Sequence, residues 1–284
     1  MATDEGETTA SETARTVQGF MALPGPVEGR REVFAGCVAE VVRVLGLDVV
    51  HRPQPGDPRT WVNQARTALY KACRRDLILS EESFETLIKA AVYDPDPSFN
   101  RHFLEPALNA FGRGRVQASL LGYLRAGTDV QRAGAANAWY WSALPLRMPT
   151  VRAEHPAGTG PAEPDDAPTV VAEWYETALR EFVINEHLDV RRRILPGLPL
   201  RKSAYPPELH DLVDAAVAIA RSHPDEYIRH RVEHQVGDRH PHWARSTTAT
   251  SENSRRKVRC PVRPVCPMHM SMHTSASPVG AAVH

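Results

Sequence analysis

The sequence predicts an all-helical fold, and three observations predict it: the spacing of apolar residues, the helix-start signals and a recurring two-helix unit. Over residues 30–237 apolar side chains recur every three or four positions, and no convincing strand alternation is present. With 284 residues, 42% of them hydrophobic, the chain is long enough to bury a sizeable core. We therefore predict an all-α domain over 30–237.

The first three helices are predicted from local signals. A second helix opens at Asp57, an acidic N-cap followed by proline at the first helical position, and a third follows Ser80, whose hydroxyl can cap residues 81–91. Cys37 and Cys73 lie on apolar stripes, where we expect small buried hydrophobes and not nucleophiles. The stripe of the first helix contains Val33, Phe34, Cys37, Val38, Val41, Val42 and Leu45.

A unit of two helices recurs along the rest of the domain. Similar segments open at Asp96, Asp129, Asp189 and Asp225, at offsets of 33, 60 and 36 residues, and we expect each aspartate to cap a first helix. The offset of 60 is explained by a flexible insertion at 145–168, which holds six prolines in 24 positions. The second helices of the units are predicted at 115–125, 169–186 and 206–221.

These units resemble HEAT-type helical repeats, including the shorter HEAT-like repeats first noted in bilin lyases. The resemblance covers about residues 96–237 and rests on the order Asp-Val-x-Arg at 129–132 and 189–192, with Pro106 and Pro196 within or just after first helices. It implies an α-solenoid of stacked helical hairpins, because a two-helix unit cannot bury both of its faces alone.

Composition separates the two ends of the chain from this domain. Residues 1–29 carry five acids against one arginine, and residues 238–284 carry two acids against seven basic residues with no apolar period. We expect both ends to be disordered. The second end is rich in soft metal ligands, but their spacing matches no zinc module, and we predict no metal function for them. They are Cys260, Cys266, Met268, His269, Met270, Met272 and His273.

Charge and composition exclude several classes of protein. A formal net charge of zero argues against a dedicated DNA-coating protein. No stretch approaches the roughly 20 apolar residues of a membrane helix, and the first residues do not resemble a signal peptide, so we expect a cytoplasmic protein with reduced thiols. The large excess of arginine over lysine indicates a GC-rich, actinobacterial-like source and says nothing about function.

The best sequence hint of a functional surface is the aromatic run Trp139, Tyr140 and Trp141. Consecutive helical residues lie about 100° apart, so these rings cannot all face one core, and Trp174 on the next helix is predicted to extend the patch. Packing between helices is the alternative explanation of the run. Trp, Tyr and Arg anchor protein interfaces, so we predict that the patch binds a partner together with the densest basic stretch of the domain. That stretch is Arg191, Arg192 and Arg193.

One predicted helix carries a candidate metal site. Glu226, His230 and His234 are spaced at i, i+4 and i+8 and share a helix face, which in principle can hold a metal ion. A solvated face has the same pattern, and we predict no metal and no cofactor. The resemblance includes iron hydroxylases with paired His-Glu dipeptides, and the sequence has that dipeptide only in the reversed order.

We therefore predict a non-catalytic helical-repeat adaptor that binds a protein partner, with a regulatory role in development or secondary metabolism as a hypothesis from context alone. Two alternatives come from other classes. One is a nucleic-acid-binding HEAT-like protein, in which further arginines align with the basic stretch across the stack. The other is a HEAT-like lyase or metal-dependent enzyme. The arginines of the first alternative are Arg113, Arg115, Arg125 and Arg132.

Overall fold

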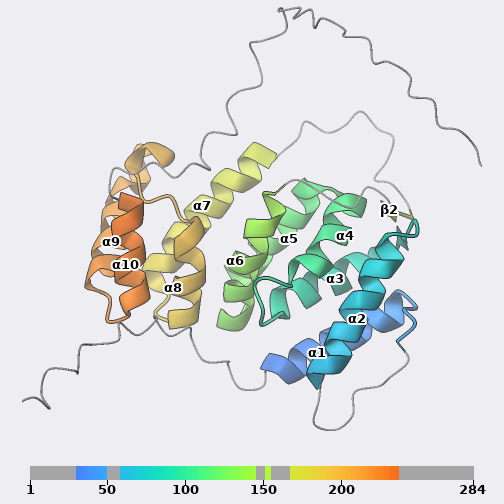
Figure 1. Ribbon diagram of the computed structural model, residues 1–284. Helices are drawn as coiled ribbons and strands as arrows, with labels where there is room; N and C mark the ends of the chain where they lie inside the picture. Colours follow the sequence, from blue (N-terminus) through green and yellow to red (C-terminus); the bar gives the residue numbers. More distant parts are fainter. Residues whose placement is uncertain (1–29, 50–57, 145–150, 155–166, 237–284) are drawn as a thin grey trace, which may run out of the picture. The chain divides into compact units, whose positions relative to one another are not determined.

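The computed structural model describes residues 30–49, 58–144, 151–154 and 167–236, and this part of the chain is mostly helical (Figure 1). The predicted ends 1–29 and 238–284, with Cys260 and Cys266, lie outside the described residues. The described helices are α1 (Arg30–Val44), α2 (Pro58–Cys73), α3 (Glu81–Tyr93), α4 (Arg101–Phe111), α5 (Arg113–Ala126), α6 (Asp129–Ser142), α7 (Ala167–Ile184), α8 (Leu188–Ile194), α9 (His210–Ser222) and α10 (Glu226–Val236). None of them combines the length and apolar character needed to cross a membrane.

The predicted starts of the second and third helices are confirmed. Helix α2 begins at Pro58, whose fixed φ suits the first helical position, and the predicted cap Asp57 lies outside the described residues. Helix α3 begins after Ser80, whose Oγ accepts a hydrogen bond from the backbone N–H of Ser83 at 3.3 Å. Each of these two helix starts is set by a few neighbouring residues, so the sequence alone is sufficient to predict it.

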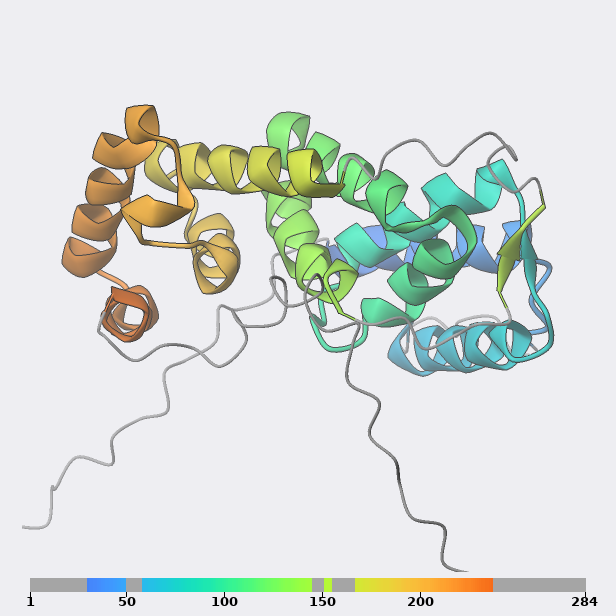
Figure 2. The same cartoon turned by 90° about the horizontal axis from the view of Figure 1, so that it is seen from above.

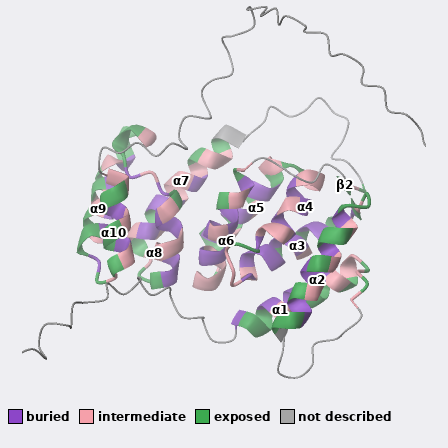
Figure 3. Ribbon diagram, viewed as in Figure 1, coloured by how far each residue is buried: buried purple, intermediate pink, exposed green. Residues whose placement is uncertain are grey.

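The predicted apolar stripes form the core. Figure 3 shows buried residues on the inner faces of the helices and exposed residues on their outer faces. Phe34 of α1 meets Phe103 of α4 edge to face, with ring centroids 5.9 Å apart. Cys37 and Cys73 are buried, as predicted, and burial raises the pKa of both thiols, that of Cys73 to about 12. Neither thiol is therefore an activated nucleophile.

Each described α-helix contacts the helix two places further along the chain. The odd-numbered helices follow one another in the order α1, α3, α5, α7, α9, and the even-numbered helices follow in the order α2, α4, α6, α8, α10. Figures 1 and 2 allow these two series to be followed through the described part. Both series bury apolar faces against their neighbours, so the core continues from one pair of helices to the next.

The pairing of consecutive helices differs from the predicted one. The sequence reading joined α4 with α5, α6 with α7 and α8 with α9, whereas extensive contacts join α3 with α4, α5 with α6, and α9 with α10. The connections explain the difference. Gly127 and Thr128 alone join α5 to α6, while the chain between α6 and α7 runs from 143 to 166.

The predicted aspartate caps are only partly found. Asp225 accepts a hydrogen bond from the backbone N–H of Ile228 at 3.1 Å and caps α10 as expected. Asp96 accepts from the N–H of Ser98 at 2.9 Å, so it closes a turn that precedes α4. Helix α4 itself has Asn100 at its N-cap, without a side-chain cap bond.

For the other two aspartates the prediction is wrong, because neither is the N-cap of its helix. Asp129 is the first residue of α6, whose cap is Thr128 in a reciprocal capping box with Gln131. Asp189 is the second residue of α8 and is buried, where it forms ion pairs. An aspartate near a helix start can cap the helix or pair with a distant arginine. Its position in the sequence repeat alone does not decide which of the two it does.

A short parallel pairing corrects two further expectations, the absence of strands and a wholly flexible insertion. Strand β1 (Ile78–Leu79) pairs with β2 (Arg152–Ala153), which lies inside the predicted insertion. The N–H of Arg152 donates to Leu77 O at 3.0 Å, and the N–H of Glu154 donates to Leu79 O at 2.8 Å. Two-residue strands are too short to produce an alternating pattern in the sequence.

Candidate functional site

The predicted aromatic patch does not exist as a surface, because two of its tryptophans are in the core. The rings of Trp139 on α6 and Trp174 on α7 are stacked, with centroids 3.9 Å apart and planes 2° from parallel. Trp139 is 8% exposed and Trp174 is buried as well. Packing between helices, the alternative weighed from the sequence, therefore accounts for both side chains.

The other two members of the run, Tyr140 and Trp141, meet edge to face, with ring centroids 5.1 Å apart, but they differ in exposure. Tyr140 is 62% exposed, and it is the member of the run that faces solvent. Trp141 is half-buried: its Nε1–H donates to Pro97 O at 2.8 Å, and the guanidinium of Arg101 lies 5.3 Å from its ring centroid. As expected from the angle between neighbours on a helix, the three side chains differ in exposure, and Tyr140 is the one exposed ring of the run rather than part of a patch.

Two arginines of the predicted basic stretch are occupied inside the fold. Arg191 donates from Nε to Phe182 O at 3.2 Å and from Nη2 to Val183 O at 3.4 Å, which satisfies carbonyls at the end of α7. Arg193 donates from Nε to Asp189 Oδ1 at 3.3 Å. Charges bound in this way stabilise helix ends and ion pairs, and they present little free positive charge to a partner.

The third arginine, Arg192, joins α8 to the start of α10 by a two-point ion pair with Asp225. Burial raises the pKa of Asp225, but the hydrogen bonds from Arg192 and from the N–H of Ile228 outweigh this effect and leave the pKa below its usual value. The same carboxylate thus caps α10 and holds α8 against it.

The four arginines expected to extend the basic stretch also have internal partners. Arg113 donates to carbonyls at and just after the end of α6, and the other three pair with carboxylates of their own or neighbouring helices. The carboxylate partners are Glu81 for Arg115, Glu173 for Arg125, and Asp129 and Glu181 for Arg132.

A buried network of charged side chains links the first helices of the chain to α8, and sequence reasoning missed it. Arg30 donates to Asp189 at 3.4 Å and to the carbonyl of Asp94 at 3.2 Å, while Arg66 pairs with the carboxylate of Asp94. All four side chains are almost fully buried. Arg30 and Asp189 are 159 positions apart, so no local signal points to their pairing.

Aromatic rings surround the charge on Arg66. Its guanidinium lies 5.3 Å from the ring centroid of Phe34, 5.1 Å from that of Phe99 and 5.9 Å from that of Phe103. Burial raises the pKa of Asp94 to about 6, although Arg66 and the N–H of Asp96 act in the opposite direction. Because its four side chains are almost fully buried, the network is a structural feature of the core.

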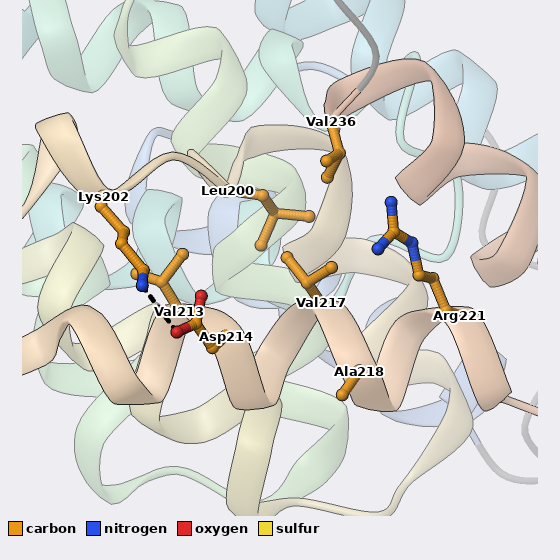
Figure 4. A pocket seen from close by; sticks show the side chains of 8 residues that line it. All are labelled: Leu200, Lys202, Val213, Asp214, Val217, Ala218, Arg221 and Val236. Atoms are coloured by element: carbon orange, nitrogen blue, oxygen red, sulfur yellow. Dashed lines mark ion pairs between the residues drawn. The ribbon is translucent and has the colours of Figure 1, made fainter.

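The described part of the chain has an open groove along α9, which is also lined by Leu200 and Lys202 of the segment before α9 and by Val236 at the end of α10 (Figure 4). Its floor is apolar, and its volume is about 350 Å³. We call it the α9–α10 groove. Its lining residues are Leu200, Lys202, Val213, Asp214, Val217, Ala218, Arg221 and Val236.

Ion pairs bound the α9–α10 groove at both ends. Lys202 Nζ lies 2.7 Å from Asp214 Oδ2 at one end (Figure 4). Arg221 at the other end donates to Glu233 at 3.1 Å. The sequence signal for the groove was the apolar stripe of the helix predicted at 206–221. The stripe does not reveal that some of its residues line an open groove and are not covered by another helix.

No protein family, curated protein or solved structure matches this chain. Function is therefore inferred from the described residues alone. Among them, His230 and His234 on α10 bring their rings together, whereas no group of three or more metal-ligating side chains is found within the described ranges. The order His-x-x-Glu-His at 230–234, also found on helices of some zinc proteases, is the sequence signal for this pair.

Proposed function

We propose that this chain is a HEAT-like helical-repeat adaptor that binds a protein partner through the α9–α10 groove. The repeat assignment is supported by the pattern of helix contacts, in which each of the helices α1 to α8 packs on the helix two places later. Stacking of this kind is expected when every two-helix unit buries its apolar faces on its neighbours. Function does not follow from fold, so the groove carries the proposal.

The groove is suited to apolar side chains. Leu200 and Val213 are buried at its floor, and Val217 and Val236 are partly exposed at its walls. Its charged residues already pair with one another or with Glu233, so few polar groups converge to orient a small polar ligand. An apolar centre inside a polar rim is the arrangement of an interface hot spot.

The proposed partner is a protein segment that presents one or two apolar side chains within polar surroundings. The arginines on which a nucleic-acid role would depend are bound to carboxylates and carbonyls of the fold. Arg side chains bind nucleic acid by displacing the counterions condensed on its phosphates, and arginines already paired with groups of the fold contribute less to this.

The test compares two alanines that are exposed on helices. Ala218 lines the groove on α9, and Ala118 lies on α5 away from it. The full-length chain, Ala218→Asp and Ala118→Asp are each immobilised and exposed to nuclease-treated lysate of the source organism. Retained proteins are quantified by mass spectrometry, and circular dichroism verifies equal helicity.

We expect a protein retained by the wild type and by Ala118→Asp to fall at least about tenfold with Ala218→Asp, because a buried unpaired carboxylate opposes apolar docking. Equal retention by both variants would contradict the role of the groove. Retention that requires omission of the nuclease would favour the nucleic-acid alternative instead.

A further inference from the structure

Two exposed histidines on α10 have rings that converge on one point. The Nε2 atoms of His230 and His234 are 3.0 Å apart, and the ring centroids are 4.4 Å apart with planes at 64°. Residues four apart lie one above the other on a helix, so α10 itself sets this spacing.

The hydrogen bond between the two rings accounts for their approach only in part. A neutral imidazole has one N–H donor and one acceptor nitrogen, so one ring must donate from Nε2 while the other accepts there. Both side chains are exposed, and water competes for such a bond at a surface. A cation placed beside the two Nε2 atoms would instead use a lone pair on each of them, with the proton of each neutral ring on Nδ1.

The nitrogen separation indicates which cations suit the pair. With bonds of 2.0–2.1 Å, as for imidazole nitrogen on zinc, two nitrogens 3.0 Å apart subtend about 95° at a shared ion. This angle is close to the right angle between neighbouring ligands in square-planar and octahedral complexes and well below the tetrahedral angle. Tetragonal nitrogen coordination is typical of Cu(II) and Ni(II).

We propose that His230 and His234 form a two-histidine site for a divalent nickel or copper ion. Glu226 and Glu233 lie on the same exposed side of α10, and Glu233 is bound by Nε of Arg221 at 3.1 Å. No third metal-ligating side chain joins the pair within the described residues. The remaining coordination positions are therefore open to water or to a ligand from another molecule.

Thermal unfolding with Ni²⁺ tests this site independently of the proposed adaptor function. The pair has its spacing only when α10 is folded, so an ion bound there stabilises the native state. At ten times the dissociation constant, the midpoint of unfolding should rise by about 3–6 °C. The full-length chain is used without a histidine tag, and Mg²⁺ at the same concentration serves as the hard-cation control.

Single substitutions locate the ion. His230→Ala and His234→Ala each remove one ligand and favour the helix, so the variants should fold but lose the Ni²⁺ shift. The matched control is His187→Ala, which removes an exposed histidine that makes no cap bond at the start of α8. His and Cys residues after 237 are the same in every variant and cancel in the comparison.

The proposal predicts a Ni²⁺ shift in the wild type and in His187→Ala, and none in the two pair variants. An equal shift in His230→Ala would mean that the ion binds elsewhere and would overturn the proposal. A wild type whose unfolding midpoint does not respond to Ni²⁺ would overturn it as well. A shift of the same size with Mg²⁺ would show general salt stabilisation and would count against a histidine site.

Discussion

At the scale of single residues, Gly134 places α6 directly against the backbone of α3. A Cβ at this position would collide with the backbone carbonyl of Val92, and a carbonyl in a helix cannot move aside as a flexible side chain can. Gly122 on α5 is the opposite case, since a Cβ there meets no atom within 4 Å.

We predict that Gly134→Ala lowers the free energy of unfolding by about 1–3 kcal/mol or more, through steric overlap. Gly122→Ala, the matched control, should raise it by up to about 1 kcal/mol, because alanine has the higher helix propensity. Urea unfolding followed by circular dichroism measures both. Similar stability of the two variants would show that α6 and α3 do not approach closely at Gly134.

At the scale of elements, the Trp139–Trp174 stack joins α6 to α7 across the long connection between them. Both rings are buried and parallel. Large aromatic side chains contribute through apolar area and through the stacked geometry. The residues that were predicted to bind a partner thus hold two consecutive helices together.

We predict that Trp139→Ala and Trp174→Ala each cost about 3–5 kcal/mol of stability, because each leaves a cavity in the core. The double variant should cost less than the sum by about 0.5–1.5 kcal/mol, the coupling expected of a stacked pair. Chemical denaturation of the wild type and the three variants measures the cycle.

Tyr140→Ala is the control for this cycle, since its side chain is next to Trp139 in sequence but exposed. It should change the stability by no more than about 0.5 kcal/mol. A Trp139→Ala variant as stable as Tyr140→Ala would restore Trp139 as a surface residue and would contradict the core assignment.

At the scale of the whole described unit, the network of Arg30, Arg66, Asp94 and Asp189 connects α1, α2, the end of α3 and α8. Asp94 has an ordinary pKa of 3.8, and burial raises it to about 6 in the folded chain. The folded state therefore binds a proton more tightly than the unfolded state does. Asp94 favours folding most at acidic pH, and this contribution is lost as the pH rises from about 4 to about 6.

We predict that the free energy of unfolding of the wild type loses up to about 3 kcal/mol of this Asp94 contribution between about pH 4 and pH 7. In Asp94→Asn the side chain does not titrate, so the pH profile of the variant should lack this decline. Denaturation at a series of pH values gives both profiles. Parallel profiles would mean that Asp94 has the same pKa in the folded and unfolded chain.

Local features were predictable from the sequence. The start of α2 at Pro58, the Ser80 cap and the apolar stripes are signals of a few neighbouring residues, and the helical class follows from them. The angular spread of Trp139, Tyr140 and Trp141 was also predictable, because about 100° separates neighbours on any helix.

The direction in which each side chain faces was decided by the tertiary structure. On a helix that is covered on two sides, the sequence spacing of apolar residues is the same for a core tryptophan and for an exposed one. Only the tertiary structure shows that Trp139 packs on Trp174. The arginines at 191–193 pair with groups on other helices, and Arg30 meets Asp189 across 159 positions. Long-range contacts of this kind depend on how helices stack, which no local sequence signal determines.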